Sequence, residues 1–128
     1  MIVGLVACCK TKAPTARRAR DLYCSALFKK SVAYLEPRVD GWAVLSALHG
    51  VVLPDQVVEP YELTLNTMPA RARSAWAAKV SAELRAKWPG ARFIVIAGRN
   101  YRDGLNVEMD VPFAGLELGE LLSALTKG

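Results

Sequence analysis

The residue types best suited to chemistry gather in one segment, residues 44–61. An apolar stretch there is followed by a hydroxyl, an imidazole, a carboxylate and a phenol, at Ser46, His49, Asp55 and Tyr61. His49 is the one histidine of the 128 residues. A strand that ends in a polar loop interrupted by Gly and Pro is a common place for catalytic groups in α/β proteins. Asp55 is the candidate general base and His49 the candidate proton donor.

A second group of reactive side chains follows the apolar run Ile2–Ala7. It consists of the thiol of Cys8 and the ammonium groups of Lys10 and Lys12. A nucleophilic Cys8 needs a base, and His49 is the one imidazole available to it. The two lysines suit a phosphate, although the glycines of a Walker phosphate-binding loop are missing around them.

The same residues also have purely structural interpretations, which the sequence leaves open. Cys8 fits a small core residue, and His49 fits a structural loop residue. Ser46 and Asp55 are common turn residues, while Tyr61 fits a packed ring. Adjacent cysteines and a single histidine lack the spacing of a metal site, so we expect neither a metal nor a cofactor.

The elements that must position these groups alternate between strands and helices. Apolar runs predict strands over residues 2–7, 42–47, 92–97 and, more weakly, 107–111. Helical periodicity and proline positions predict helices over residues 21–35, from about 67 to 88, and 118–125. This alternation predicts an α/β fold, in which residues 1–128 form a single domain with a mostly parallel central sheet of about four strands, flanked by helices.

Three predicted strands end in polar residues, at residues 8–12, 46–50 and 98–101. The carboxyl ends of parallel strands meet at one edge of a sheet, and ligands bind outside that edge. We therefore expect one pocket to be lined by Cys8 or Lys10, Ser46 or His49, and Asp55 or Tyr61.

The overall charge and composition narrow the class of partner. The chain carries 17 Lys+Arg against 12 Asp+Glu, a net charge of +5 that favours an anionic partner such as a phosphate or a nucleic acid. The basic residues concentrate in one predicted loop, at Lys10, Lys12, Arg17, Arg18 and Arg20. No apolar run has the length that a bilayer requires, so we expect no membrane partner. Three cysteines without an export signal predict a reducing, cytoplasmic location.

Several motifs together resemble a known family. Residues 6–12, 21–28, 45–55 and 59–61, continued by 97–101 and 112–119, resemble the DUF6884 family, which is similar in turn to YaaA-like proteins. The resemblance covers nearly the whole chain and implies a uracil-DNA-glycosylase-like α/β fold and an association with DNA. The family pattern carries over to Cys8, Lys10, Lys12, Tyr23, Ser25, Ser46, His49, Gly50, Pro54, Asp55, Pro60 and Tyr61. Cys9 and Cys24 depart from it.

The leading functional hypothesis is an enzyme that cleaves or exchanges an N-glycosidic bond of a nucleotide or nucleic acid. Asp55 would activate water or stabilise an oxocarbenium-like sugar, and His49 would stabilise the departing base. The remaining candidates bind substrate: Lys10, Lys12 and Ser25 on phosphate, Tyr23 or Tyr61 stacked on the base, and Ser46. Two alternatives stay open: a non-catalytic nucleotide-binding or nucleic-acid-binding module, and a transferase with Cys8 as its nucleophile.

Overall fold

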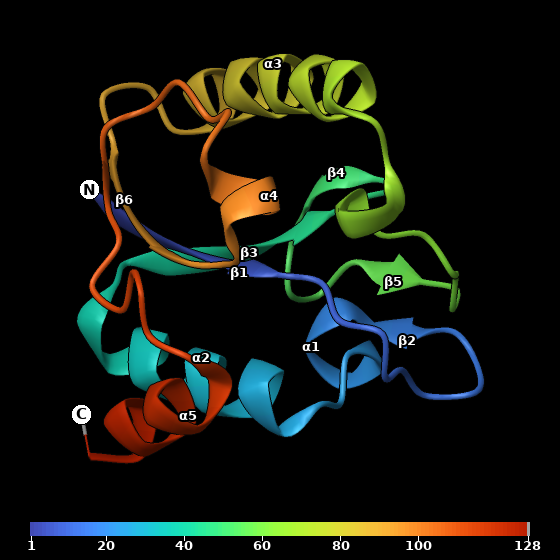
Figure 1. Ribbon diagram of the computed structural model, residues 1–128, viewed down its shortest axis with the longest axis vertical. Coiled ribbons are helices and arrows are strands. Elements are labelled where there is room, and N and C mark those ends of the chain that lie inside the picture. The colour runs from blue at the N-terminus through green and yellow to red at the C-terminus, as the bar shows by residue number, and fades with distance from the viewer. Residues whose placement is uncertain (128) are drawn as a thin grey trace.

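A five-stranded sheet organises the molecule, as the computed structural model of the chain shows for residues 1–127 (Figure 1). The strands stand in the order β4-β3-β1-β6-β7. Their bounds are β1 Ile2–Ala7, β3 Gly41–Ser46, β4 Gly50–Val52, β6 Arg92–Ile96 and β7 Met109–Asp110. β1, β3, β6 and β7 run parallel, and β4 pairs antiparallel with β3. The predicted α/β fold with a mostly parallel sheet is confirmed.

β1 lies at the centre of the sheet, between β3 and β6, so the predicted neighbours are confirmed. Its side chains alternate between two apolar clusters. Val3 and Leu5 pack with α3 (Ala70–Lys87), whereas Val6 packs with α2 (Ala26–Leu35) and α5 (Leu118–Lys127). A strand buried on both faces requires an apolar run, which explains the composition of β1.

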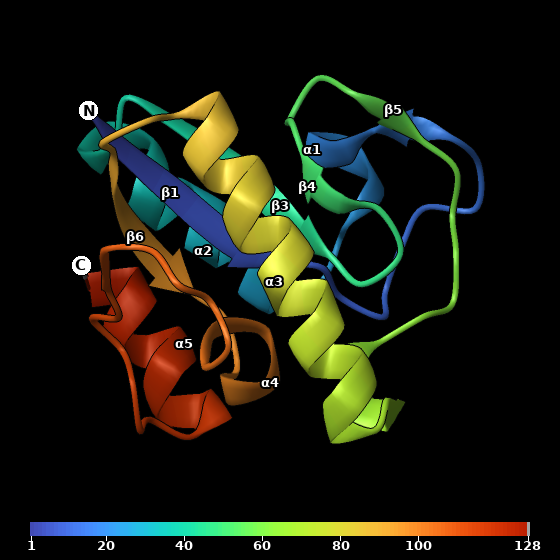
Figure 2. The ribbon, with the colours of Figure 1, turned by 90° about the horizontal axis from the view of Figure 1, so that it is seen from above.

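The helices form a layer on each side of the sheet (Figures 1 and 2). α2 connects β1 to β3 on one face, where α5 lies beside it, and α3 connects β4 to β6 on the other. The short elements are α1 (Ala19–Leu22), α4 (Arg99–Arg102), η1 (Glu36–Arg38) and η2 (Leu65–Thr67). Within residues 1–127 no helix combines the length and apolarity needed to span a membrane.

The strand count was predicted one too low, because β4 lies in a segment interpreted as loop. Only three residues separate β4 from β3, and Gly50 closes this turn with a φ of +73°. A Cβ at Gly50 would also lie 2.5 Å from Glu83 Oε1, so both the backbone and the space favour glycine there. A separate ribbon pairs β2 (Arg17–Arg18) with β5 (Val57–Val58) and was not predicted either.

The helix predicted over residues 21–35 is broken in two. Tyr23 is extended and forms an isolated bridge with Lys12, which ends α1. α2 then begins after Ser25, whose Oγ accepts a hydrogen bond from the backbone N–H of Phe28 at 3.1 Å. A serine N-cap of this kind satisfies one of the free N–H groups in the first turn of a helix.

Candidate functional site

The carboxyl edge of the sheet opens between β1 and β6. After β1 the chain turns toward β3, since the backbone N–H of Cys8 donates to the carbonyl of Leu45 at 3.0 Å. After β6 the chain continues into α4, whose Tyr101 lies beside Cys8. The connection from β1 to β3 runs through α2 on one face of the sheet, and the connection from β4 to β6 runs through α3 on the other face. The order of the strands therefore reverses between β1 and β6. Open α/β sheets bind ligands in the crevice at such a point.

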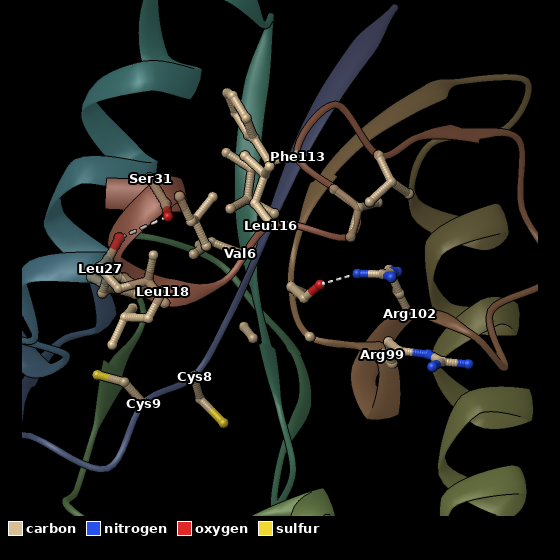
Figure 3. A pocket seen from close by; sticks show the side chains of 18 of the residues that line it. Val6, Cys8, Cys9, Leu27, Ser31, Arg99, Arg102, Phe113, Leu116 and Leu118 are labelled. Atoms are coloured by element: carbon tan, nitrogen blue, oxygen red, sulfur yellow. Dashed lines mark hydrogen bonds between the residues drawn. The ribbon is translucent and has the colours of Figure 1, made fainter. Parts of the chain in front are cut away.

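A cavity of about 740 Å³ occupies this crevice (Figure 3). One part of its wall is apolar and includes Leu27, Phe113, Leu116, Leu118 and Leu121. The other part is polar and includes Cys8, Cys9, Ser25, Arg99, Arg102 and Asp103. The volume falls within the range of roughly 300–1,000 Å³ that is typical of small-molecule sites.

Two arginines of α4 give the polar wall its charge, and they differ in freedom. The Arg102 side chain is 17% exposed and donates from Nη1 to the carbonyl of Ala97 at 3.0 Å. The Arg99 side chain is 82% exposed, and its ion pair with Asp103 spans 3.4 Å within α4. Arg102 therefore fixes the end of β6, whereas Arg99 is the cation that can turn toward a ligand.

The same polar part of the wall also carries a hydroxyl and two thiols. Ser25 caps α2 at the edge of the cavity, so the first turn of a ten-residue helix faces it with its positive dipole end. The thiol of Cys9 donates to the carbonyl of Thr11 at 3.1 Å, and Cys8 Sγ lies 3.5 Å from the hydroxyl of Tyr101.

The hydroxyl of Tyr101 links Cys8, at the edge of the cavity, to the segment at Thr64 and Leu65. Its oxygen accepts from the backbone N–H of Leu65 at 3.2 Å and lies 3.2 Å from Thr64 Oγ1. Burial and the hydrogen bond to Cys8 raise the pKa of Tyr101 to about 12. At neutral pH this phenol is therefore protonated, and its oxygen lies within hydrogen-bond distance of both Cys8 Sγ and Thr64 Oγ1.

A second polar group lies on the other side of β1, next to β3. We call Lys12, Tyr23, Ser46 and Tyr61 the tyrosine cluster. The hydroxyl of Tyr61 lies 2.6 Å from both Ser46 Oγ and the hydroxyl of Tyr23. Lys12 Nζ lies 4.6 Å from the centre of the Tyr61 ring and donates to the carbonyl of Cys9 at 2.6 Å. Each polar atom of this cluster already has a partner.

Burial dominates the electrostatics of the tyrosine cluster. It raises the pKa of Tyr23 to about 12 and raises the pKa of Tyr61 further above its ordinary value. Both phenols are neutral near pH 7. Their hydroxyls form a hydrogen-bonded chain that ends at Ser46, which is fully buried. A neutral, enclosed chain of hydroxyls holds neighbouring strands and loops together and offers little to a ligand.

Three residues predicted for the site lie elsewhere. Asp55 is exposed and paired with Arg18 at 3.5 Å and Arg20 at 3.3 Å. His49 is exposed in the β3–β4 turn, where its ring meets the Tyr61 ring edge-on at 5.3 Å. Lys10 is exposed beyond β1 and does not line the cavity. The structure thus brings Cys8 and Ser25 to the cavity and Lys12, Tyr23, Ser46 and Tyr61 to the tyrosine cluster. His49 adjoins this cluster, because its ring contacts Tyr61 and its backbone N–H donates to Ser46 Oγ at 3.0 Å, whereas Lys10 and Asp55 belong to neither group.

Comparison with known proteins now places the chain in a family. The model of a family of unknown function, DUF6884, matches residues 3–127. The chain belongs to the DUF6884 family. No curated protein matches it. The family match confirms that part of the resemblance seen in the sequence.

This DUF6884 chain offers few groups to a metal. Within residues 1–127, no cluster of three or more His, Cys, Asp and Glu side chains could hold an ion. The side chains around the cavity instead suit an organic anion, because two guanidinium groups, a serine hydroxyl and the start of α2 stand opposite an apolar wall.

Sequence reasoning missed most of the residues that line the cavity. Arg99, Arg102 and Asp103 follow β6, and the strand-end rule had pointed to residues 98–101 without selecting the charged ones. Phe113 and Leu116 belong to a segment without helical or strand periodicity, and only its position in the fold brings it over the crevice.

Proposed function

We propose that this protein binds a nucleotide in the cavity between β1 and β6. One observation carries the proposal: the 740 Å³ cavity at the point of strand reversal joins an apolar wall to a cationic one. A nucleotide has the matching parts, a flat base that buries apolar surface and a phosphate that needs cations and N–H donors.

The two walls suggest how the ligand lies. The phosphate lies between Arg99 and the start of α2, where Ser25 supplies a hydroxyl and the helix end a favourable potential. The base lies against Phe113 and Leu116, and the ring of Phe113 offers a stacking surface. The sugar then passes over the ends of β1 and β6, close to Cys8.

A second candidate function is N-glycosidic cleavage or exchange in this same cavity. It carries forward the nucleobase-directed activity that the resemblance to YaaA-like proteins and uracil-DNA-glycosylase-like folds implies. The observation that favours it is Asp103, the one carboxylate among the described residues that line the cavity. It pairs with Arg99 at 3.4 Å and with Arg102 at 3.6 Å, and a carboxylate beside the sugar can stabilise an oxocarbenium-like transition state.

The binding proposal is tested by calorimetric titration with a panel of nucleoside 5′-monophosphates and with inorganic phosphate. We expect at least one monophosphate to bind, and its affinity to fall about tenfold or more in Arg99→Gln, because a hydrogen bond to a charged group contributes about 1.5–3 kcal/mol. Arg92→Gln is the matched control, since Arg92 pairs with Asp110 at the far end of β6. Equal losses in both variants, or no binding by any monophosphate, would refute the proposal.

The catalytic candidate needs a separate assay. Chromatographic detection of free base, with nucleotides and short oligonucleotides as substrates, compares the native protein with Asp103→Asn. The candidate predicts base release that Asp103→Asn abolishes while nucleotide affinity stays within a few-fold. Binding without base release by the native protein leaves the binding-module alternative as the function.

A further inference from the structure

A second, smaller cavity adjoins the first across α4. Its volume is about 280 Å³. Its lining comes from α3 and from the chain at and after α4, and its polar members are Arg73, Ser74, Arg99, Asn100 and Asp103. Arg99 and Asp103 line both cavities, so α4 forms the divide between them and Arg99 reaches either side.

The polar groups of this second cavity are held in place. Arg73 Nη1 donates to the carbonyl of Met68 at 2.7 Å, and Asn100 Nδ2 donates to Asn66 Oδ1 at 2.9 Å. These bonds reduce the conformational entropy that either side chain loses when a ligand binds.

The wall between α3 and α4 is also fixed. A Cβ at Gly104 would lie 2.8 Å from the Cβ of Ala77, closer than such atoms approach one another. The chain after α4 therefore packs directly on α3, and the absence of a side chain at Gly104 keeps both this packing and the adjoining space.

The charges of the second cavity favour an anion. The lining holds two guanidinium groups, Arg73 and Arg99, and one carboxylate, Asp103, which pairs with Arg99 at 3.4 Å and with Arg102 at 3.6 Å. An amide from Asn100 and a hydroxyl from Ser74 add neutral donors. Few apolar groups are present, so the cavity suits a small, strongly hydrogen-bonding anion and not a second base.

We propose that this cavity, lined by Arg73, Arg99 and Asn100, binds a second phosphate of the same nucleotide ligand. The inference rests on the proposed function, since the base and first phosphate occupy the larger cavity. Arg99 lies between the two phosphates and contacts both. The second phosphate has two chemical sources: a phosphomonoester on the same sugar, or the phosphodiester that links the next nucleotide of a strand.

The test measures three ligands with the same base: a nucleoside 5′-monophosphate, the nucleoside 3′,5′-bisphosphate and the dinucleotide. We expect the bisphosphate, the dinucleotide or both to bind about tenfold more tightly than the monophosphate, as one additional charge-assisted contact provides. A gain for the bisphosphate alone assigns a terminal phosphate, and a gain for the dinucleotide assigns a strand.

The decisive variant is Arg73→Gln, compared with Arg71→Gln, which removes the same charge from the same helix two residues away, outside the cavity. Arg73→Gln should remove the tenfold gain and leave monophosphate affinity unchanged, whereas Arg71→Gln should keep the gain. Arg73→Lys retains the charge and should restore part of the tenfold gain in affinity. This variant also guards against a folding defect in the glutamine variant.

The outcomes separate this inference from the proposed function. If the monophosphate binds and the two larger ligands bind no more tightly, the second-phosphate site is refuted and the proposed function stands. If Arg73→Gln keeps the full gain, the site is likewise refuted. If none of the three ligands binds, the proposed function fails and the inference fails with it.

Discussion

The two sides of β1 at its carboxyl end differ in how their polar groups are used. Between β1 and β3, the hydroxyls of Tyr23, Ser46 and Tyr61 bond to one another at 2.6 Å, and burial keeps both phenols protonated. Between β1 and β6, Arg99 is 82% exposed beside a cavity of about 740 Å³. We call the first the closed side, because its polar groups bond to one another. We call the second the open side, because it adjoins the cavity.

The difference teaches that residue type alone does not locate a site. Hydroxyls, a lysine and a histidine gather on the β3 side, which is the richer in residues that perform chemistry. The hydroxyls and the lysine are nevertheless hydrogen-bonded within the protein, and buried polar groups with partners stabilise a fold without binding anything. A ligand needs groups that still have bonding capacity, and here those groups stand on the β6 side.

The largest effect should come from filling the open side. Gly98 lines the cavity, has a φ of −66° that any residue adopts, and a Cβ there would meet no heavy atom within 4 Å. Gly98→Leu should therefore fold normally and weaken nucleotide binding by more than about tenfold, measured by calorimetry. Gly41→Leu, at the far end of the sheet and equally unobstructed, is the control and should keep full affinity. Full affinity in Gly98→Leu would contradict this assignment of the cavity.

The next effect separates stability from binding on the closed side. Tyr61→Phe removes the hydroxyl between Ser46 and Tyr23 and leaves two buried groups without that partner. We expect a loss of about 1–3 kcal/mol in the free energy of unfolding, measured by urea denaturation, with unchanged nucleotide affinity.

Tyr34→Phe is the matched control for that variant. Tyr34 contacts Phe113 and Arg38 through its ring, which phenylalanine retains. Its loss of stability should be smaller than that of Tyr61→Phe. A strong loss of nucleotide binding in Tyr61→Phe would mean that the closed side is part of the site.

Alkaline pH should destabilise the protein through phenols on both sides of β1, Tyr23 in the tyrosine cluster and Tyr101 beside Cys8. The folded pKa values of Tyr23 and Tyr101 are raised from 10.0 to about 12, so the folded state retains protons that the unfolded state has lost. The stability contributed by these phenols is complete below pH 10 and is lost as the pH rises toward 12. Thermal unfolding measured between pH 8 and 11.5 should show a falling midpoint above pH 10. Tyr23→Phe should make that fall shallower, and an identical fall in the variant would contradict the assignment.

The smallest effect is expected at the carboxylate that sequence reasoning placed first. Asp55 is 74% exposed, and its two pairs with Arg18 and Arg20 lie at the surface. Asp55→Asn should change the free energy of unfolding by no more than about 1 kcal/mol and leave nucleotide affinity unchanged. If base release is found in the native protein, its loss in Asp55→Asn would restore the catalytic role predicted from the sequence.

The fold was largely predictable because its signals are local. The apolar runs of β1, β3 and β6 and the periodicity of α3 each lie within one segment, and strand–helix alternation supplies the parallel order. The short pieces were missed. The three residues of β4 and the two of β2 carry too little pattern to be recognised, and they exist because a turn at Gly50 and pairing with β5 position them.

The candidate site was less predictable because distant segments build it. The strand-end rule correctly gathered residues after β1, β3 and β6 at one edge. It could not tell that Cys8 and Ser25 line the cavity while Ser46 and Tyr61 bond to each other on the β3 side. Which of these residues line the cavity depends on where the strand order reverses. That position depends on the connections of all the strands. Phe113 comes from an irregular segment, and its only sequence signal was the family motif at residues 112–119, which gave it no role.

The most direct test of the account is an amide NMR titration of the protein with a nucleoside 5′-monophosphate. The two sides of β1 have distinct reporters, Ser25, Cys9 and Arg99 on one and Ser46 and Tyr61 on the other. The account predicts saturable shifts at Ser25, Cys9 and Arg99, with Ser46 and Tyr61 nearly unmoved. Shifts concentrated at Ser46 and Tyr61, with the amides beside β6 unchanged, would contradict it.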